Sequence, residues 1–272
     1  IRNRCALMPI TTIDGIIAGL RPSEGLLKAG VAMEAAGLYH SHFYSPGRPG
    51  AAVAPSSGLN GTALTSYAGQ IPFVNPPGGS DSHLALFSLR SNVACSVLLH
   101  DRLWHNSGLS LTITTSQSIT SPTWPPRGRA GATLGEGILV GLEFSAAGGA
   151  GTPTLTLGYT NQAGTAGRTA TFVGATTPNA GTFFPWPLAA GDTGVRSVQS
   201  CQLSVTWTSG TAHLVAYRIL AELDIEANRG DKVDALTSGF PRLYDSTVPF
   251  LVQLASAATA TMLKGRLVIA QG

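Results

Sequence analysis

Charged residues are scarce in this chain of 272 residues: they make up 11% of the sequence, less than half of the roughly 25% that is usual for soluble domains. Lysine is the scarcest cation, with only Lys28, Lys232 and Lys264 against 14 arginines. Arginine is enriched and lysine depleted at protein interfaces, because the guanidinium group is less hydrated and bonds carboxylates in pairs. Genomic base composition can produce the same ratio. The low charge therefore indicates either a surface that meets other subunits or an exterior rich in Ser, Thr and Asn.

Three further features that the chain lacks limit the kinds of partner and location that we expect for it. The net charge is only +3, and no run of four or more basic residues occurs, so we expect neither nucleic acid nor a membrane surface as a partner. No apolar stretch approaches the roughly 18 residues that a spanning helix requires. No secretory signal opens the chain.

Cysteine is also rare, and its spacing excludes a disulfide framework. Cys5, Cys95 and Cys201 are far apart, odd in number and form no CxxC pair. Cys95 and Cys201 lie in apolar, strand-like segments, so we expect them to act as small buried hydrophobic residues. That expectation suits a reducing compartment.

Alternation of aliphatic residues with Thr and Ser is the strongest pattern present. Leu155, Leu157 and Tyr159, for example, alternate with threonines, which is typical of antiparallel strands with one buried side. Many such segments at short spacing, separated by Gly- and Pro-rich turns, predict an all-β, jelly-roll-like antiparallel β-sandwich with an extended N-terminal arm. The same alternation predicts eight interior residues: Leu109, Leu111, Ile113, Leu203, Val205, Trp207, Val215 and Tyr217.

Two local arrangements follow from the pattern between residues 205 and 220. Ser209-Gly210 fits a two-residue turn that would pair 205–208 with 211–214, because Gly supplies the positive φ. Residues 214–220 are apolar on both faces apart from Arg218. A strand of that kind is covered on both sides, so we expect it to be central.

The chain divides into three predicted regions. Residues 1–65 form an N-terminal arm, in which Thr12 caps a short helix and a Pro- and Gly-rich crossing follows. Residues 66–226 form the sandwich body. Residues 227–272 supply a C-terminal strand pair, 248–255 and 262–270, which closes as a hairpin, packs on the body or joins a neighbouring subunit. The arm has apolar residues but no core of its own, so we expect it to lie across the body or a neighbouring subunit and to make intersubunit or capsid contacts.

Four groups of residues have the composition of a chemical site, and none is complete. His40 and His42 would share one face of a strand, a spacing found in some metal sites, but no third ligand is nearby. Glu136 and Glu143 could suggest a glycosidase pair, yet Glu143 stands between Leu142 and Phe144 as an ordinary outward strand residue does. The tripeptide 229–231 (Arg-Gly-Asp) fits a charged turn better than a receptor motif.

The fourth group is the segment 100–106, which holds two histidines, Asp101, Arg102 and Trp104. A hydrolase would need a nucleophile beside the imidazole, and the chain has neither a GxSxG motif nor a suitably placed Ser or Cys. We expect Asp101 and Arg102 to pair across a strand end while Trp104 fills the core or an interface. The sequence therefore assigns no catalytic, cofactor-binding or metal-binding residue, and it predicts no enzyme.

Several blocks of the chain resemble virion structural proteins of tailed bacteriophages. The resemblance spans roughly residues 38–225 and rests on 38–41, 47–52, 64–73, 95–108, 159–171 and 190–197. It implies membership of a virus particle assembled in the bacterial cytoplasm. It carries over no catalytic or binding residue, because these blocks read as turns and strand ends.

Together with the low charge and the arm, this resemblance predicts a capsid cement (decoration) protein that bridges major capsid proteins. We expect it to bind the capsid as a homo-oligomer, specifically a trimer. The first alternative is a tail, collar or baseplate protein. The second is a host-receptor or glycan-binding module, in which tryptophans would line the site. Exposed Trp124 and Trp186 would favour binding, and buried ones would favour a structural role.

Overall fold

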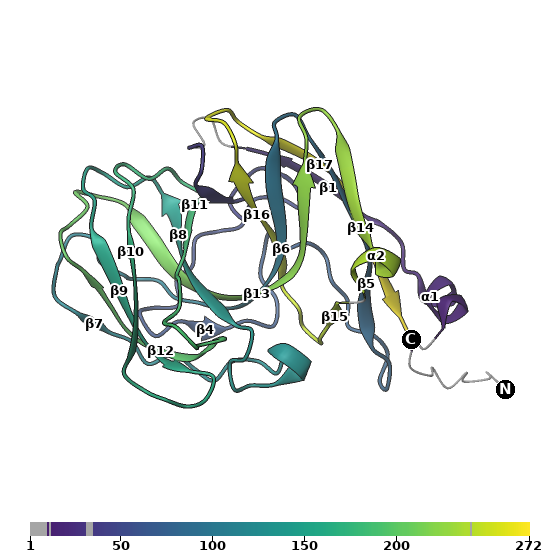
Figure 1. Cartoon of the computed structure of the whole chain (residues 1–272), viewed down its shortest axis with the longest axis horizontal. Coiled ribbons are helices and arrows are strands. Elements are labelled where there is room, and N and C mark those ends of the chain that lie inside the picture. Colours follow the sequence, from purple (N-terminus) through teal and green to yellow (C-terminus); the bar gives the residue numbers. More distant parts are fainter. Residues whose placement is uncertain (1–9, 11, 31–34, 240) are drawn as a thin grey trace.

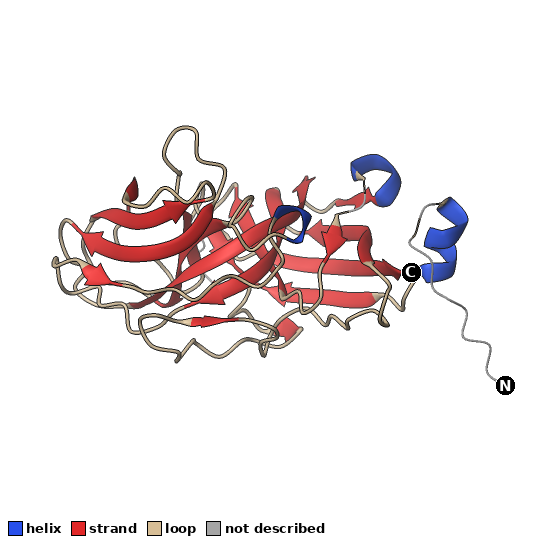
Figure 2. Ribbon diagram, turned by 90° about the horizontal axis from the view of Figure 1, so that it is seen from below, coloured by secondary structure: helices blue, strands red, loops and turns tan. Residues whose placement is uncertain are grey.

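The computed structural model describes residues 10, 12–30, 35–239 and 241–272, and nearly all of its regular structure is antiparallel β-strand. In this range the helical elements are short: α1 (Ile13–Gly19), α2 (Ala235–Ser238) and a 3-10 turn at Arg129–Gly131. The all-β prediction is confirmed. Figure 2 shows strands through the whole body, with α1 at one end beside the C-terminus.

Six strands close into a barrel at the centre of the molecule (Figure 1). Each pairs with the next, and the last pairs back with the first. In order they are β13 (Thr211–Ile225), β8 (Leu139–Ala146), β11 (Thr182–Pro185), β2 (Tyr39–Ser41), β16 (Pro249–Ala255) and β6 (Cys95–His105). A two-residue strand, β4 (Thr62–Ala63), adds to the free end of β6.

Two open sheets flank the barrel, one on each side (Figure 1). The first, here called the mid-chain sheet, has the order β10 (Arg168–Val173), β9 (Thr154–Asn161), β12 (Val195–Leu203) and β7 (Gln117–Ser118). The second, here called the terminal sheet, has the order β14 (Gly230–Asp234), β5 (Ser82–Ser91), β17 (Met262–Gln271), β1 (Glu24–Ala29) and β3 (Gly47–Arg48), with β15 (Arg242–Leu243) paired to β5. Each of the two open sheets therefore packs face to face against one side of the same central barrel.

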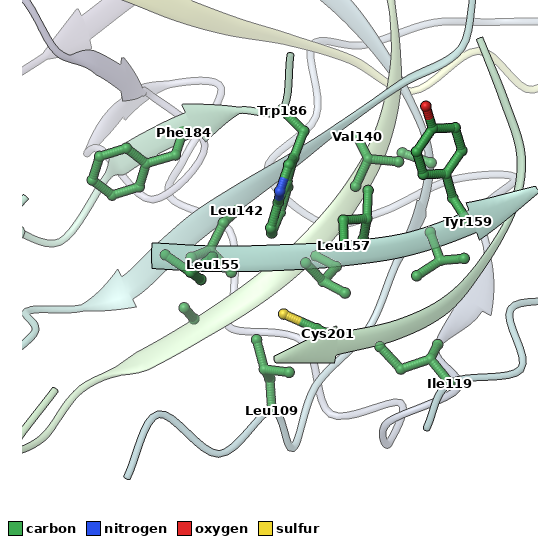
Figure 3. Close-up of a cluster of buried hydrophobic side chains, with 14 of the residues drawn as sticks. Leu109, Ile119, Val140, Leu142, Leu155, Leu157, Tyr159, Phe184, Trp186 and Cys201 are labelled. Atoms are coloured by element: carbon green, nitrogen blue, oxygen red, sulfur yellow. The ribbon is translucent and has the colours of Figure 1, made fainter. Parts of the chain in front are cut away.

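Three apolar clusters correspond to this layering. The largest lies between the barrel and the mid-chain sheet and contains Leu142, Leu157 and the buried thiol of Cys201 (Figure 3). A second lies between the barrel and the terminal sheet, and a third fills the barrel itself. One strand, β6, supplies Val97 to the second cluster and Trp104 to the first. Cys95 is buried, as predicted, and Cys5 lies outside the described residues.

The two-sided apolar segment of β13 is central, as its sequence predicts. Leu214 and Ala216 pack toward the mid-chain sheet, while Val215 and Tyr217 point into the barrel. All four are buried. A strand between two packed surfaces needs apolar residues on both faces, which is why strict alternation is lost here.

Two of the eight residues predicted to be interior are on the surface: Ile113 is 40% exposed and Val205 is 50% exposed. Neither lies in a strand, and 205–208 does not pair with 211–214. The predicted hairpin is wrong because β12 belongs to the mid-chain sheet and β13 to the barrel, so the connection crosses between layers. Trp207 anchors this crossing by its backbone bond to the carbonyl of Leu111.

The N-terminal segment begins as predicted and then joins the body. The Thr12 hydroxyl accepts a hydrogen bond from the backbone N–H of Gly15 at 3.0 Å and caps α1. Residues 24–48, which lie inside the predicted arm, supply β1, β2 and β3, and β1 lies between β17 and β3. The described residues before β1 lie mostly on the surface, as do most of residues 50–61. The two C-terminal strands do not form a hairpin, because β16 joins the barrel and β17 the terminal sheet.

Candidate functional site: a buried ionic cluster inside the barrel

A fully buried ion pair is the most unusual chemical feature of the barrel interior. Arg102 on β6 and Glu143 on β8 are 2.7 Å apart between Nη2 and Oε2, and both side chains are inaccessible to solvent. The Tyr44 hydroxyl donates to the same carboxylate oxygen at 2.9 Å. Leu142 and Phe144 pack outside the barrel, so alternation along β8 directs Glu143 inward. The prediction that Glu143 points outward is therefore wrong.

Aromatic rings complete the surroundings of Arg102. Its guanidinium carbon lies 4.3 Å from the ring centre of Phe43 and 5.3 Å from that of Phe250, which favours a cation over the ring faces. Burial would raise the pKa of Glu143, but the Arg102 charge and the donated hydrogen bonds outweigh it and lower that pKa. Burial acts against the charge of Arg102 as well, yet Glu143 raises its pKa. The pair therefore stays ionised.

Neutral imidazoles occupy the rest of the interior. The ring of His100 stacks on Tyr217 with centroids 4.4 Å apart, and burial lowers its pKa to about 3. His213 contacts the carbonyl of Asn106 at 2.9 Å and the hydroxyl of Ser145 at 2.8 Å, and burial lowers its pKa too. His105 accepts from Arg102 Nε at 3.2 Å. These rings are enclosed, so they cannot exchange protons with a substrate in solution.

Asp101 pairs with Arg127 on the opposite side of β6, and not with Arg102 as predicted. The Nε–Oδ2 distance is 3.1 Å, and both side chains are fully buried. Successive residues of a strand point to opposite faces, which separates Asp101 from Arg102. Arg127 also donates to the carbonyls of Leu64 and Arg102 at 2.8 and 2.9 Å and to that of Ser246. It therefore joins three loops to the barrel. Nothing in its Pro-rich sequence context predicts this role.

The two histidines of the suspected metal pair are buried and engaged separately. His40 Nε2 accepts from the backbone N–H of Ala35 at 3.0 Å, and His42 Nε2 lies 2.8 Å from Oε1 of Gln253. Burial lowers both pKa values to about 4. Within the described ranges, no three His, Cys, Asp or Glu side chains gather closely enough to hold a metal ion.

The remaining candidates are also dispersed. Glu136 is on the surface, 3.5 Å from Arg129, and Glu143 is sealed in the barrel, so the two carboxylates do not face a common cleft. The bend in the 226–231 segment falls at Asn228, with φ +62°, and Gly230 is already part of β14. All four tryptophans are buried: Trp104, Trp124, Trp186 and Trp207.

The buried charged groups therefore interact with other residues of the barrel and not with a ligand from solution. Each ionisable group of the interior is paired or held neutral, and none reaches solvent. Neither α-helix of the described range has the length or the apolar run that crossing a membrane requires. The residues that sequence reasoning missed are Tyr44 and Arg127, which belong to irregular segments without periodic signal.

Comparison with known proteins identifies no family. No family model matches the chain, and no curated protein matches it. Solved structures with weak similarity include one of infectious bursal disease virus, Gx strain (12% identity, 74% of this chain, 44% of that chain, TM-score 0.15), and the VP2 subviral particle of that virus (10%, 93%, 64%, TM-score 0.16). The chain thus spans 44% and 64% of those two chains. TM-scores this low do not identify a common fold, so function has to be inferred from the geometry of the chain.

Proposed function

We propose that this chain is a structural subunit of a virus particle, with no catalytic role. In its most specific form, the proposal is a capsid cement protein of a tailed bacteriophage, a homo-oligomer that bridges major capsid proteins in the assembled virion. A tail, collar or baseplate position is the alternative within the same class. The sequence resemblance over residues 38–225 supplies the phage assignment.

The apolar face that α1 leaves uncovered is the observation that carries the proposal. Ile13 and Ile17 are 61% and 62% exposed, and the helix buries none of its own residues. Beside it, a groove of about 570 Å³ is lined mainly by apolar residues: Pro22, Pro72, Val74, Pro76, Pro77, Leu267 and Ile269, with Arg21, Glu24, Asn75 and Gln271. An isolated soluble protein rarely leaves neighbouring apolar side chains uncovered, and such a patch marks an interaction surface.

The interior supports a structural role in a second way. Most of the ionisable residues that sequence alone could assign to chemistry, from His40 to Glu143, are buried and have no access to a substrate, and the exposed Glu136 faces no second carboxylate. All four tryptophans are buried, which favours a structural role over the glycan-binding alternative. A rigid body with an uncovered apolar end is what a subunit of a large assembly needs.

The decisive test is electron cryomicroscopy of phage particles assembled with variant subunits. Ile13→Ser/Ile17→Ser should abolish incorporation while the circular dichroism spectrum stays that of a folded β protein, because α1 adds nothing to the core. Val173→Ser on β10 is the matched control, since it removes an equally exposed apolar side chain from another surface. Equal incorporation of both variants would contradict the role of α1. Absence of the unmodified chain from the particle would contradict the proposed function itself.

Truncation gives a second test. β1 belongs to the terminal sheet, so the shortened chain should begin at residue 21 and keep that strand. We expect this chain to fold and to fail in assembly. A truncated chain that assembles normally would show that the apolar end is not a contact.

A further inference from the structure

The outer face of the terminal sheet carries a cluster of cations. Leu263 and Leu267 of β17 point into the core, so Lys264 and Arg266 between them point outward. Lys264 lies directly opposite Arg90 of β5. The opposite side of the sheet is therefore apolar and buried, whereas this side is basic and exposed.

The cluster continues across two more strands. Lys264 is also opposite Leu27 of β1, and Leu27 is opposite Arg48 of β3. These residues form one row across four neighbouring strands, with Arg266 two residues further along β17. We call Arg48, Arg90, Lys264 and Arg266, together with the part-exposed Leu27, the basic face.

Within the described ranges, no carboxylate forms an ion pair with Arg48, Arg90, Lys264 or Arg266. The ion pairs of the described residues involve other cations, and the carboxylate that shares this side of the sheet, Asp234, lies 3.3 Å from Lys232. Like charges directly opposite one another on neighbouring strands are destabilising. A sheet that keeps Lys264 opposite Arg90 therefore has a face suited to an anionic partner.

An acidic counterpart exists on the same chain. At the C-terminal end of β13, Leu223 and Ile225 pack against the terminal sheet, so Glu222 and Asp224 face the other way. Both are exposed, and their cross-strand neighbours Leu98 and Ser96 are uncharged. Asp224 accepts a hydrogen bond from the Ser96 hydroxyl. Ile219 is on the same side of β13 and is partly exposed. We call Glu222, Asp224 and Ile219 the acidic stripe.

We propose that copies of this chain associate head to tail, with the basic face of one copy docked on the acidic stripe of the next. The two surfaces lie on opposite sides of one two-layer packing, because the terminal sheet and β13 meet through their apolar sides. Each surface combines charge with an apolar side chain, Leu27 on one and Ile219 on the other. A contact between different patches is heterologous, so it closes into a ring or continues as a filament. A closed ring of this kind would be the homo-oligomer of the proposed function, and to that extent this inference rests on it.

Charge reversal tests the pairing directly. Arg90→Glu/Lys264→Glu makes the basic face acidic, and Glu222→Lys/Asp224→Lys makes the acidic stripe basic. Either double variant should weaken self-association in sedimentation velocity by roughly tenfold or more. The quadruple variant, which carries both reversals, should regain it. Raising the salt concentration should weaken association of the original protein as well, because the Debye length shortens to about 3 Å at 1 M.

The control variant changes the same charge elsewhere. Arg129→Glu/Arg196→Glu reverses two exposed cations away from the terminal sheet, and it should associate as the original protein does. Circular dichroism and tryptophan emission verify that each variant is folded. Mixing the two double variants should restore association as well, because each then offers the complement of the other.

Three results would overturn the proposal: an original protein that stays monomeric at low salt, double variants that associate normally, or a quadruple variant that does not recover. A fourth would redirect it: if the Arg90→Glu/Lys264→Glu variant loses binding to a fluorescent DNA duplex in an anisotropy assay but keeps self-association, the partner of the basic face is nucleic acid and the head-to-tail contact is wrong. Failure of the charge variants leaves the proposed function standing, because that function is tested by the particle itself.

Discussion

Mild acid should destabilise this protein well before its carboxylates are protonated, because five of its six histidines are buried. Burial lowers the pKa of His40 and His42 to about 4, that of His100 to about 3 and that of His105 to about 2. His213 is shifted in the same direction. In the unfolded chain these rings titrate near 6.5.

The sign of the effect follows from which state binds more protons. Below pH 6.5 the histidines of the unfolded chain become protonated, whereas the buried histidines of the folded protein stay neutral. The free energy of unfolding is therefore highest above about pH 6.5, and it falls as the pH decreases toward the pKa values of the folded state. At pH 5 each of the four rings with a pKa near or below 4 costs about 2 kcal/mol, or about 8 kcal/mol for the four. A domain has about 5–15 kcal/mol in total. Burial raises the pKa of Asp101 despite the nearby Arg127, so protonation of this one carboxylate favours the folded state as the pH falls and opposes the effect of the histidines.

Urea unfolding followed by tryptophan emission measures this dependence, since all four tryptophans are buried. The free energy of unfolding should fall steeply between pH 6.5 and pH 5, with a slope that corresponds to several protons. Equal unfolding midpoints at pH 7.5 and pH 5.5 would refute the reasoning, because buried neutral histidines cannot leave stability independent of pH in that window.

A single substitution isolates one of these protons. His100→Phe keeps the ring stacked on Tyr217 and removes a polar group that has no hydrogen-bond partner among the described residues. This variant should be more stable than the original at pH 5, and the slope should decrease by about one proton. A slope that His100→Phe does not reduce would show that this ring is not held neutral.

Three further outcomes are expected. Glu143→Leu should destabilise the protein by about 3–5 kcal/mol in urea unfolding, since it leaves Arg102 charged and unpaired, and Arg102→Leu/Glu143→Leu should recover much of that loss; equal stability of the two variants would contradict the pairing. Val215→Asp, at a fully buried position, should cost several kcal/mol, whereas Val205→Asp, at a half-exposed one, should cost about 0.5 kcal/mol or less. Treatment with EDTA should leave the melting temperature unchanged; a decrease that zinc reverses would return attention to His40 and His42.

Local alternation predicted the strands well wherever one face is buried. Thr154–Asn161 forms a strand, as the alternation of Leu155, Leu157 and Tyr159 with threonines predicts, because these three residues all meet one core. The failure at 205–208 has a different cause. Alternation over four residues also arises in an irregular crossing, where Trp207 and the backbone N–H of Thr208 hold the segment and Val205 faces solvent.

Closure of the barrel could not be predicted from the sequence. It depends on pairings such as His40 with Gln253, which are more than 200 residues apart and leave no local signal. The prediction that Glu143 faces outward is wrong for a related reason. Sequence shows that Glu143 alternates with Leu142 and Phe144, but an acidic residue between two apolar ones normally faces water, and only the barrel gives its side a buried partner.

The two buried ion pairs explain how the register of β6 is fixed, although this strand contacts all three apolar clusters. β6 is apolar or aromatic on most positions, so the hydrophobic pattern alone specifies its alignment weakly. A shift by one residue would turn Arg102 toward the mid-chain core and Asp101 into the barrel, separating each from its partner, Glu143 or Arg127. Breaking a buried pair costs about 3–5 kcal/mol, so two broken pairs would cost a large share of the stability of a domain. The charges at 101 and 102 therefore select one alignment among several that burial of apolar area leaves nearly equal.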